Sequence, residues 1–436
     1  MTRLACYRCG ATEDDLDRKR CDCGEPLWFD TDDAAAGFEW PDSTPGACGP
    51  DAPDSTPSSR VASADPGIWR YRDLLPVDSP GPNAGVLAAA GDTPLVRAPR
   101  LDADAGCRLW LKDERANPTG SFKDRGSAVG AARVASEARV ADADSAWLGT
   151  VSHGNMAVSV AATAAGVGAS AVVLVPADVA PARLAAIAEY DPEIIRVAGD
   201  YGALYRRTHE VDAPVTVLNS DAPLRVAGQK TTALEICEAF ARGAAGDGTS
   251  APDAIVLPVS SGGHASAAWK ALRELRRATL LGDDAPRLYL VQAAACDPIA
   301  AAFRADADEV TPLADPEETV AYSIANPDPP SGTRALAAAR ATGGAVLSVP
   351  DDEILDAKDR LARDAGFAVE PSSATTLAGL RSLSASGELG ADDEVVAVLT
   401  GRGFGAARDG EPLSDPETVD LAAVRERIES LVAGKL

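Results

Sequence analysis

Short runs of β-branched and other apolar residues alternate with alanine-rich stretches from about residue 66 to residue 430. The apolar runs predict strands at 145–152, 169–176, 193–199, 253–260, 287–293 and 394–401. The stretches between them, such as NMAVSVAATAAG and ARLAAIAEYD, favour helices. Strands that alternate with helices form βαβ units, in which helices cover both faces of a parallel sheet. The pattern therefore predicts an α/β fold.

The N-terminal 30 residues carry two close pairs of cysteines, Cys6 with Cys9 and Cys21 with Cys23. Two such pairs can close a tetrahedral thiolate site, and so short a segment needs a metal to fold. We expect a zinc ribbon over residues 1–30; the alternatives are a ribbon that has lost its metal and scattered free thiols. The isolated cysteines are interpreted as small hydrophobic residues, namely Cys48, Cys107, Cys237 and Cys296.

Residues 31–65 have a different composition, dominated by proline, aspartate and serine, with DSTP at both 42–45 and 54–57. They show no apolar period, so we expect a linker between the ribbon and the body of the protein.

The net charge of the chain limits the kinds of partner that it can bind. The chain has 66 acidic and 41 basic residues, a net charge of −25, which argues against nucleic-acid and anionic-lipid partners. Arginine far outnumbers lysine, and an acid-rich, lysine-poor surface suits concentrated salt, so we expect a halophilic source. No apolar run is long enough to cross a membrane, and the first residues lack a signal core. We therefore expect a cytoplasmic protein.

The string Asn117–Gly126, NPTGSFKDRG, opens an alanine-rich helical stretch. A helix N-terminus can lower the pKa of Lys123, and such a lysine can hold an aldehyde as a Schiff base. Taken alone, the string also fits a surface lysine that caps a helix.

This string resembles the lysine motif of pyridoxal-phosphate enzymes with the tryptophan-synthase-β fold, and most closely that of the threonine synthase family. The resemblance spans residues 66–410 and recurs in order in five further segments, at 151–156, 219–231, 258–264, 370–374 and 399–401. The cysteine ribbon is also familiar from that family. The resemblance implies a two-domain fold-type-II enzyme over residues 66–430, with a smaller subdomain at about 130–225 inserted in the larger one.

The family's site residues can be carried over motif by motif. Lys123 would bind the cofactor and act as catalytic acid and base. The cofactor-binding residues would be Lys123, Asn155, Ser260, Ser261, Gly262, Gly263, His264 and Thr400. The substrate-binding residues would be Ser152, His153, Gly154, Met156, Asn219, Ser220 and Arg225.

Local chemistry agrees with two of these assignments. Residues 260–264 follow a strand and open a helix, where small residues let backbone N–H groups close on a phosphate. Thr400 ends a strand, and its neutral hydroxyl could hydrogen-bond the pyridine nitrogen of the cofactor.

The resemblance implies a reaction that converts O-phospho-L-homoserine and water to L-threonine and phosphate, in a homodimer that binds a small amino-acid substrate. Several positions depart from the family pattern, among them His153, Met156 and His264. The alternative is a related enzyme acting by β-elimination or β-replacement, such as a threonine or serine dehydratase or a cysteine or cysteate synthase. Arg225 discriminates between them, because a dehydratase has no substrate phosphate to bind. A non-catalytic protein whose ribbon binds nucleic acid is a further alternative, which the acidic charge disfavours.

Overall fold

A computed structural model describes residues 2–41, 65–141, 146–152, 154–198, 204–205, 207–208, 213–246, 248–282 and 285–403. All of them belong to one compact unit, Met1–Phe404. Every helix among these residues is too short or too polar to span a bilayer.

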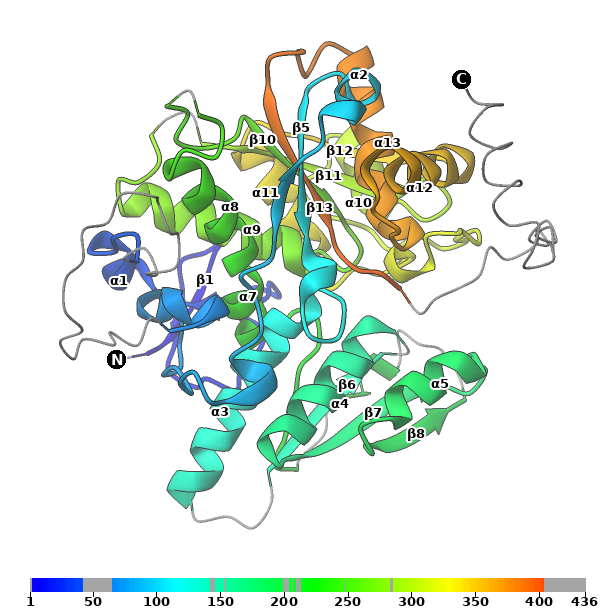
Figure 1. Ribbon diagram of the computed structural model, residues 1–436. Coiled ribbons are helices and arrows are strands. Elements are labelled where there is room, and N and C mark those ends of the chain that lie inside the picture. Colours follow the sequence, from blue (N-terminus) through cyan, green and yellow to red (C-terminus); the bar gives the residue numbers. More distant parts are fainter. Residues whose placement is uncertain are drawn as a thin grey trace, which may run out of the picture. The chain divides into compact units, whose positions relative to one another are not determined.

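The larger sheet has six strands in the order β12-β11-β10-β13-β5-β4 (Figure 1). Their bounds are β4 Leu95–Arg97, β5 Arg108–Asp113, β10 Ala254–Pro258, β11 Arg287–Ala293, β12 Val346–Val349 and β13 Glu394–Leu399. All neighbours pair in parallel except β4, which runs antiparallel to β5. The expectation of purely parallel sheets is therefore wrong at this edge. A short connection joins β4 to β5, and it leaves no room for the crossover that a parallel pair requires.

The strands of this sheet are buried on both faces, as their unbroken apolar runs predict. Alternate residues of β13 enter different cores: Val396 and Val398 on one face, Val395, Ala397 and Leu399 on the other. One face is covered by α8 (Thr231–Ala241), α9 (Gly263–Arg277), α10 (Pro298–Arg304) and α11 (Gly332–Ala341). The other is covered by α2 (Asp102–Ala105), α12 (Asp351–Ala365) and α13 (Pro371–Ala385).

The smaller sheet has four parallel strands in the order β8-β7-β6-β9. Their bounds are β6 Trp147–Val151, β7 Ser170–Pro176, β8 Glu193–Val197 and β9 Val215–Val217. The helices of this part are α3 (Lys123–Ala141), α4 (Asn155–Val167), α5 (Pro181–Ala188) and α7 (Pro223–Gln229), and Figure 1 shows α4 and α5 beside the sheet. The strands predicted from apolar runs are all present; β4, β5, β9 and β12 were not predicted.

The N-terminal ribbon is a three-stranded antiparallel sheet of β1 (Leu4–Cys6), β2 (Thr12–Glu13) and β3 (Leu27–Phe29). Residues 31–41, which the sequence assigned to the linker, instead form helix α1 (Asp32–Ala36) and its extension. Ala35 and Phe38 are buried in the large core, which holds this short segment in place. The remainder of the predicted linker, 42–64, lies outside the described residues.

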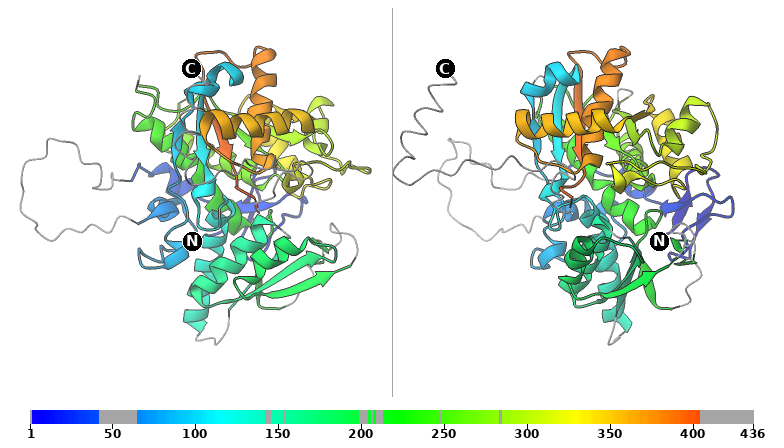
Figure 2. Two further views of the ribbon diagram at one scale, coloured as in Figure 1. Left: turned by 45° about the vertical axis from the view of Figure 1, so that its right-hand side comes forward. Right: turned by 90° about the vertical axis from the view of Figure 1, so that its right-hand side faces the viewer.

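The ribbon lies against the body of the protein, as both views of Figure 2 show. The guanidinium of Arg334, on α11, is fully buried and donates to the carbonyl oxygens of Pro26 and Leu27, each at 3.2 Å. The ring of Trp28 packs edge-on against Trp269 of α9, with ring centroids 5.6 Å apart. Polar and aromatic contacts therefore anchor the ribbon to α9 and α11.

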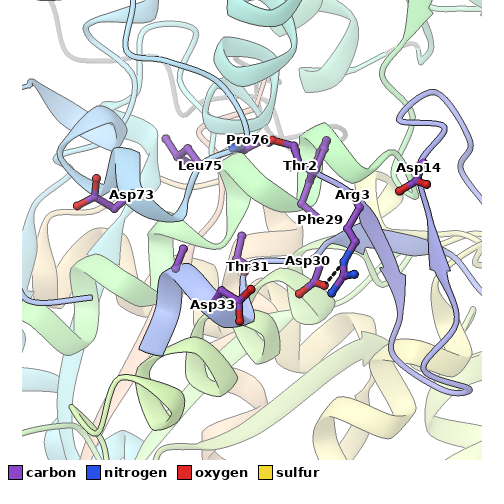
Figure 3. Close-up of a pocket in the computed structure, with 11 residues that line it drawn as sticks. Thr2, Arg3, Asp14, Phe29, Asp30, Thr31, Asp33, Asp73, Leu75 and Pro76 are labelled. Carbon is purple, nitrogen blue, oxygen red and sulfur yellow. Dashed lines mark hydrogen bonds and ion pairs between the residues drawn. The ribbon is translucent and has the colours of Figure 1, made fainter. Parts of the chain in front are cut away.

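A recess of about 560 Å³ remains between the ribbon, α1 and the 3₁₀ helix η1 (Gly67–Leu74). Figure 3 shows aspartate side chains around it, with Arg3 in an ion pair with Asp30 at 2.7 Å. The lining carboxylates belong to Asp14, Asp30, Asp33 and Asp73. Their exposure accords with the acidic surface expected from the net charge.

A buried network of charges holds the start of α3. Arg125 is fully buried and donates to Glu114 through Nε at 2.7 Å, and to both carboxylate oxygens of Glu235 at 2.7 Å. Lys112 adds a second cation beside Glu235, with Nζ 2.7 Å from Oε2. Burial alone would raise the pKa of Glu235, but Arg125 and Lys112 hold it well below its usual range. The network joins the end of β5, the start of α3 and α8.

We predict that Arg125→Met lowers the free energy of unfolding by about 3–5 kcal/mol, because it leaves two buried carboxylates undercompensated. The matched control is Arg133→Met on the same helix, which removes only a surface ion pair with Glu137. It should cost less than about 1 kcal/mol. Denaturant titrations that give equal losses for the two variants would contradict this interpretation.

Candidate active site

A cavity of about 930 Å³ lies where strand ends of the two sheets converge. Val151 and Ser152 at the end of β6, Asn219 after β9, Pro258 at the end of β10 and Thr400 after β13 all line it. In open α/β sheets, ligands bind at the carboxyl ends of parallel strands. The size suits a cofactor together with a small substrate.

The loop that carries Lys123 is fastened to the chain after β13. The Phe122 N–H donates to the Thr400 carbonyl oxygen at 3.1 Å, and the Arg402 N–H donates to the Gly120 carbonyl oxygen at 3.1 Å. Gly120 has φ +87°, and a Cβ there would lie 2.5 Å from the Arg402 side chain. These contacts place Lys123, the first residue of α3, beside Thr400.

The amine of Lys123 lies in a cationic, largely enclosed environment. Its Nζ is 4.0 Å from the centroid of the Phe122 ring. Burial and the nearby Arg225 guanidinium lower the pKa of Lys123 well below its usual range, against the opposing effect of Glu370. Both effects favour the neutral amine, which is the form that a nucleophile or general base requires.

Glu370 faces Lys123 from the start of α13. The Asn155 amide, at the start of α4, donates to both Glu370 carboxylate oxygens at 3.3 and 3.2 Å. Burial raises the pKa of Glu370, while Lys123 and Asn155 oppose that rise. A Cβ on Gly401 would lie 2.9 Å from both side chains, so only glycine lets the chain pass so close to them.

The segment Ser260–His264 turns from β10 into α9. Gly262 has φ +85°, and a Cβ there would meet the Ser331 carbonyl oxygen at 2.3 Å. Asn326 donates to the Ser261 hydroxyl at 2.9 Å, which braces the turn from outside. The helix that follows has 15 residues, so its first N–H groups carry the partial positive charge of a full helix end.

His264 is buried in this wall, stacked on Phe122 with ring centroids 4.1 Å apart. Its Nε2 is 3.2 Å from the Thr232 hydroxyl, while its Nδ1 has no hydrogen-bond partner among the described residues. Burial and the nearby basic side chains of Lys123, Arg125 and Arg225 lower the pKa of His264 well below its usual range. The ring is therefore neutral.

Arg225 projects from α7, which packs against α3 through glycines. A Cβ on Gly228 would lie 2.0 Å from the Arg125 carbonyl oxygen, so the two helices approach backbone to backbone. The Gln229 amide oxygen, with the amide turned toward the guanidinium, accepts from Arg225 Nε at 3.1 Å and Nη2 at 2.9 Å. Arg225 is 4% exposed and lines the same cavity as Lys123.

The side chain of Asn219 holds two neighbouring segments together. Its amide oxygen accepts from the Val151 N–H at 3.0 Å, and its amide nitrogen donates to the Thr208 hydroxyl at 3.1 Å. Both ends of the side chain are thus used to tie the loop after β9 to the end of β6. Ser220, the next residue, lines the cavity.

The cavity brings together nearly all the site residues predicted from the sequence. They are Lys123, Ser152, Gly154, Asn155, Met156, Asn219, Ser220, Arg225, Ser260, Ser261, Gly262, Gly263, His264 and Thr400. His153 lies outside the described residues. Their individual roles stay predictions.

The sequence alone assigned no role to three further residues in or beside the cavity wall, namely Glu370, Ser373 and Arg20. Ser373 hydrogen-bonds the Thr400 hydroxyl at 3.0 Å, and Glu370 bonds Asn155. Both lie in the 370–374 segment, whose resemblance to the family could have identified them. Arg20 of the ribbon also lines the cavity, and no sequence signal marked it.

Comparison with known proteins gives consistent results. The family model "Pyridoxal-phosphate dependent enzyme" matches residues 86–401. A threonine synthase of Methanocaldococcus jannaschii is 36% identical, covering 78% of this chain and 80% of that protein. One of Methanosarcina acetivorans is 36% identical over 81% of this chain and 82% of its own length. The chain belongs to the threonine synthase family of pyridoxal-phosphate dependent enzymes.

Solved structures agree on the fold. Maize serine racemase aligns with a TM-score of 0.57 at 21% identity, covering 79% of this chain and 93% of its own. A fungal L-serine ammonia-lyase from Rhizomucor miehei aligns with a TM-score of 0.58 at 20% identity, covering 77% and 97%. Both alignments support the fold-type-II α/β architecture.

The residues present fit pyridoxal phosphate. The cavity offers a lysine amine with a lowered pKa, a glycine turn at the N-terminus of a long helix, and the Nδ1 of His264, which has no hydrogen-bond partner among the described residues. The buried Ser121 hydroxyl, two residues before Lys123, likewise has no hydrogen-bond partner within the described chain. An enclosed aldehyde with a phosphate group matches this set of donors.

We predict that the purified protein has a visible absorbance band, which borohydride bleaches while fixing the pyridoxal group on Lys123. Peptide mapping should find the label on Lys123 and not on Lys230. The latter amine is also buried, with its pKa lowered to about 8, but it is ion-paired with Glu274 at 2.7 Å. A protein that stays colourless after pyridoxal phosphate is added would refute the cofactor assignment.

Proposed function

We propose that the protein converts O-phospho-L-homoserine and water to L-threonine and phosphate. The observation that carries the proposal is that the Lys123 amine, whose pKa is lowered, shares one cavity with the buried guanidinium of Arg225. This pairs a proton-transfer group with a site for an anionic leaving group. The threonine synthases that match this chain support the same assignment.

In this proposal Lys123 binds the aldehyde of the cofactor and the turn at 260–264 binds its phosphate. Asn155 would face the ring hydroxyl, and Thr400, bonded to Ser373, would face the ring nitrogen. When bound, pyridoxal phosphate withdraws electrons from the carbons next to the substrate amine. The neutral Thr400 hydroxyl cannot protonate the ring nitrogen as an aspartate would, so this withdrawal is moderated.

Lys123 would then move protons at the substrate Cα and Cβ. Its lowered pKa leaves the amine free to take a proton near neutral pH and return it later. Glu370 lies close enough to influence that amine electrostatically, and its own pKa is raised by burial. The carboxylate would thereby stabilise Lys123 in its protonated form during the transfer.

Arg225 would hold the phosphate that leaves from Cγ. Cγ then takes up a proton to become the methyl group of threonine, and water adds at Cβ. Charge-assisted, two-pronged hydrogen bonds from a guanidinium suit a phosphate group. Gln229 fixes the orientation of the guanidinium from α7. Asn219, through its bonds to Val151 and Thr208, would position Ser220 rather than contact the substrate itself. Ser152, His153 and Gly154 would hold the substrate carboxylate.

The second candidate is a related enzyme that performs β-elimination or β-replacement on an unphosphorylated amino acid. Met156 favours it, because this buried side chain lines the cavity where the family pattern has a hydroxyl. Arg225 counts against it, since an unphosphorylated substrate offers the guanidinium no partner.

For the ribbon we propose a structural zinc ion. The sulfur atoms of Cys6, Cys9, Cys21 and Cys23 all lie within 4.8 Å of one another. The pairs Cys6–Cys23 and Cys9–Cys21 are 3.5 Å apart, too far for disulfides. Zinc with four Zn–S bonds of about 2.3 Å needs sulfurs about 3.8 Å apart, so the set fits the metal.

We also propose a homodimer that works in the cytoplasm at high salt. The homodimer rests on the resemblance to the family. The salt and the compartment are supported by the net charge of −25 and by the absence of disulfides among the described cysteines. Reduced cysteines are typical of a reducing compartment.

We predict one zinc ion per chain in protein purified without chelators. Cys9→Ser should abolish binding, whereas Cys107→Ser, a buried thiol far from the ribbon in sequence, should retain it. Metal removal should expose the N-terminal 30 residues to limited proteolysis while the cofactor band persists, because no cysteine of the ribbon lines the cavity. Metal analysis that finds no zinc would mean that the site is vestigial.

We predict that Arg225→Ala loses about 1.5–3 kcal/mol of transition-state stabilisation with O-phospho-L-homoserine, or roughly ten- to a hundredfold in kcat/KM. Arg225→Lys should recover only part, because a point charge cannot reproduce the planar fork. Phosphate release and threonine formation measure the effect. A wild type that ignores phosphohomoserine, acts on serine or threonine and tolerates Arg225→Ala would establish the second candidate instead.

A further inference from the structure

Arg20 is the residue of the ribbon that enters the active-site cavity. It lies between β2 and β3, directly before Cys21, and forms an isolated β-bridge with Pro26. Its side chain lines the same cavity as Lys123 and Arg225, although about a hundred residues separate it from the nearest of them in sequence. The cavity wall is therefore completed by the N-terminal segment.

The guanidinium of Arg20 contacts three oxygen atoms from different segments of the chain. Its Nη2 is 3.2 Å from Asp221 Oδ2 and donates to the Pro330 carbonyl oxygen at 2.9 Å. Its Nη1 donates to the Gly24 carbonyl oxygen at 2.8 Å, within the ribbon. One fork-shaped cation thus links the ribbon to two loops of the body.

Both loops belong to the walls on which the proposed function rests. Asp221 follows Ser220, whose carbonyl oxygen lies 2.5 Å from the position that a Cβ on Gly263 would occupy. Pro330 precedes Ser331, whose N–H donates to the Ser261 carbonyl oxygen at 2.9 Å. Arg20 therefore links two parts of the cavity wall. One is the loop with Ser220, which is proposed to bind the substrate phosphate. The other contains Ser331, which supports the turn proposed to bind the cofactor phosphate.

Burial distinguishes this ion pair from the others in the ribbon. The side chain of Asp221 is fully buried, while that of Arg20 is 37% exposed toward the cavity. Among the described residues, Arg18, two positions earlier, forms ion pairs with Glu13 and Asp22 of the ribbon, and its Nε donates to the Arg20 carbonyl oxygen at 2.9 Å. The Asp22 side chain is 91% exposed. A pair with a buried carboxylate fixes geometry, whereas a solvated pair contributes little.

We propose that the ribbon is a working part of the substrate site, in which Arg20 is a positioning residue that sets affinity for the phosphorylated substrate. By holding Asp221, Arg20 orients Ser220 toward the substrate phosphate, and by holding Pro330 it supports the Ser261 turn proposed for the cofactor phosphate. The inference rests on the proposed function and adds the ribbon to the determinants of that site.

The test compares holoenzymes of wild type, Arg20→Ala, Arg20→Lys and the matched control Arg18→Ala. KM and kcat for O-phospho-L-homoserine and inhibition by inorganic phosphate are measured beside the cofactor absorbance band. Arg20→Ala should raise KM and the phosphate inhibition constant roughly tenfold, with kcat and the band little changed. Arg20→Lys should fall between, and Arg18→Ala should match wild type.

A second arm uses Asp221→Asn, which removes the charge from the other side of the pair. It should raise KM as Arg20→Ala does, and the double variant should add little to either single change, because partners in one interaction are not additive.

The possible results distinguish failure of this inference from failure of the proposed function. Phosphate release by wild type, with Arg20→Ala indistinguishable from Arg18→Ala, overturns this inference and leaves the proposed function intact. Loss of the cofactor band in both Arg20 variants also overturns it, because Arg20 would then serve only folding. A wild type that releases no phosphate overturns the proposed function and this inference with it.

Discussion

The site depends above all on the burial of Arg125 between Glu114 and Glu235. Lys123 is two residues away on the same helical turn, so the network that fixes Arg125 also fixes the amine. Leu399 pairs in register with Asp113, which brings the end of β13 beside the end of β5. Buried charges are costly unless fully paired, and here each has a partner. The network therefore holds the start of α3, and with it Lys123, in a fixed position.

Close helix packing then determines the electrostatics of the cavity. Gly228 lets α7 approach the start of α3, and this brings the Arg225 guanidinium toward Lys123. Burial and this guanidinium together lower the pKa of Lys123. The Gln229 amide, four residues later on the same helix, orients the Arg225 guanidinium.

The sequence predicted the parts of the fold and site that depend on local patterns. Unbroken apolar runs identified β10, β11 and β13, because strands buried on both faces need them. Motif order identified Lys123 and the 260–264 turn. The sequence could not reveal β4, whose three residues are only half-buried, or α1, which is held by tertiary contacts. The pairing of Asn155 with Glu370 was equally inaccessible, because 215 residues separate them in the chain.

Arginine connects distant segments throughout this protein, and its chemistry explains why. Arg125, Arg334 and Arg20 each satisfy several acceptors from different segments, which a lysine ammonium does less specifically because it lacks a planar fork. A composition with many arginines and few lysines therefore serves two ends. It leaves the surface acidic, and it supplies interior cations that can hold three elements at once. The ribbon shows the consequence: a segment too small for a core of its own is docked by Arg334 and, through Arg20, reaches the cavity.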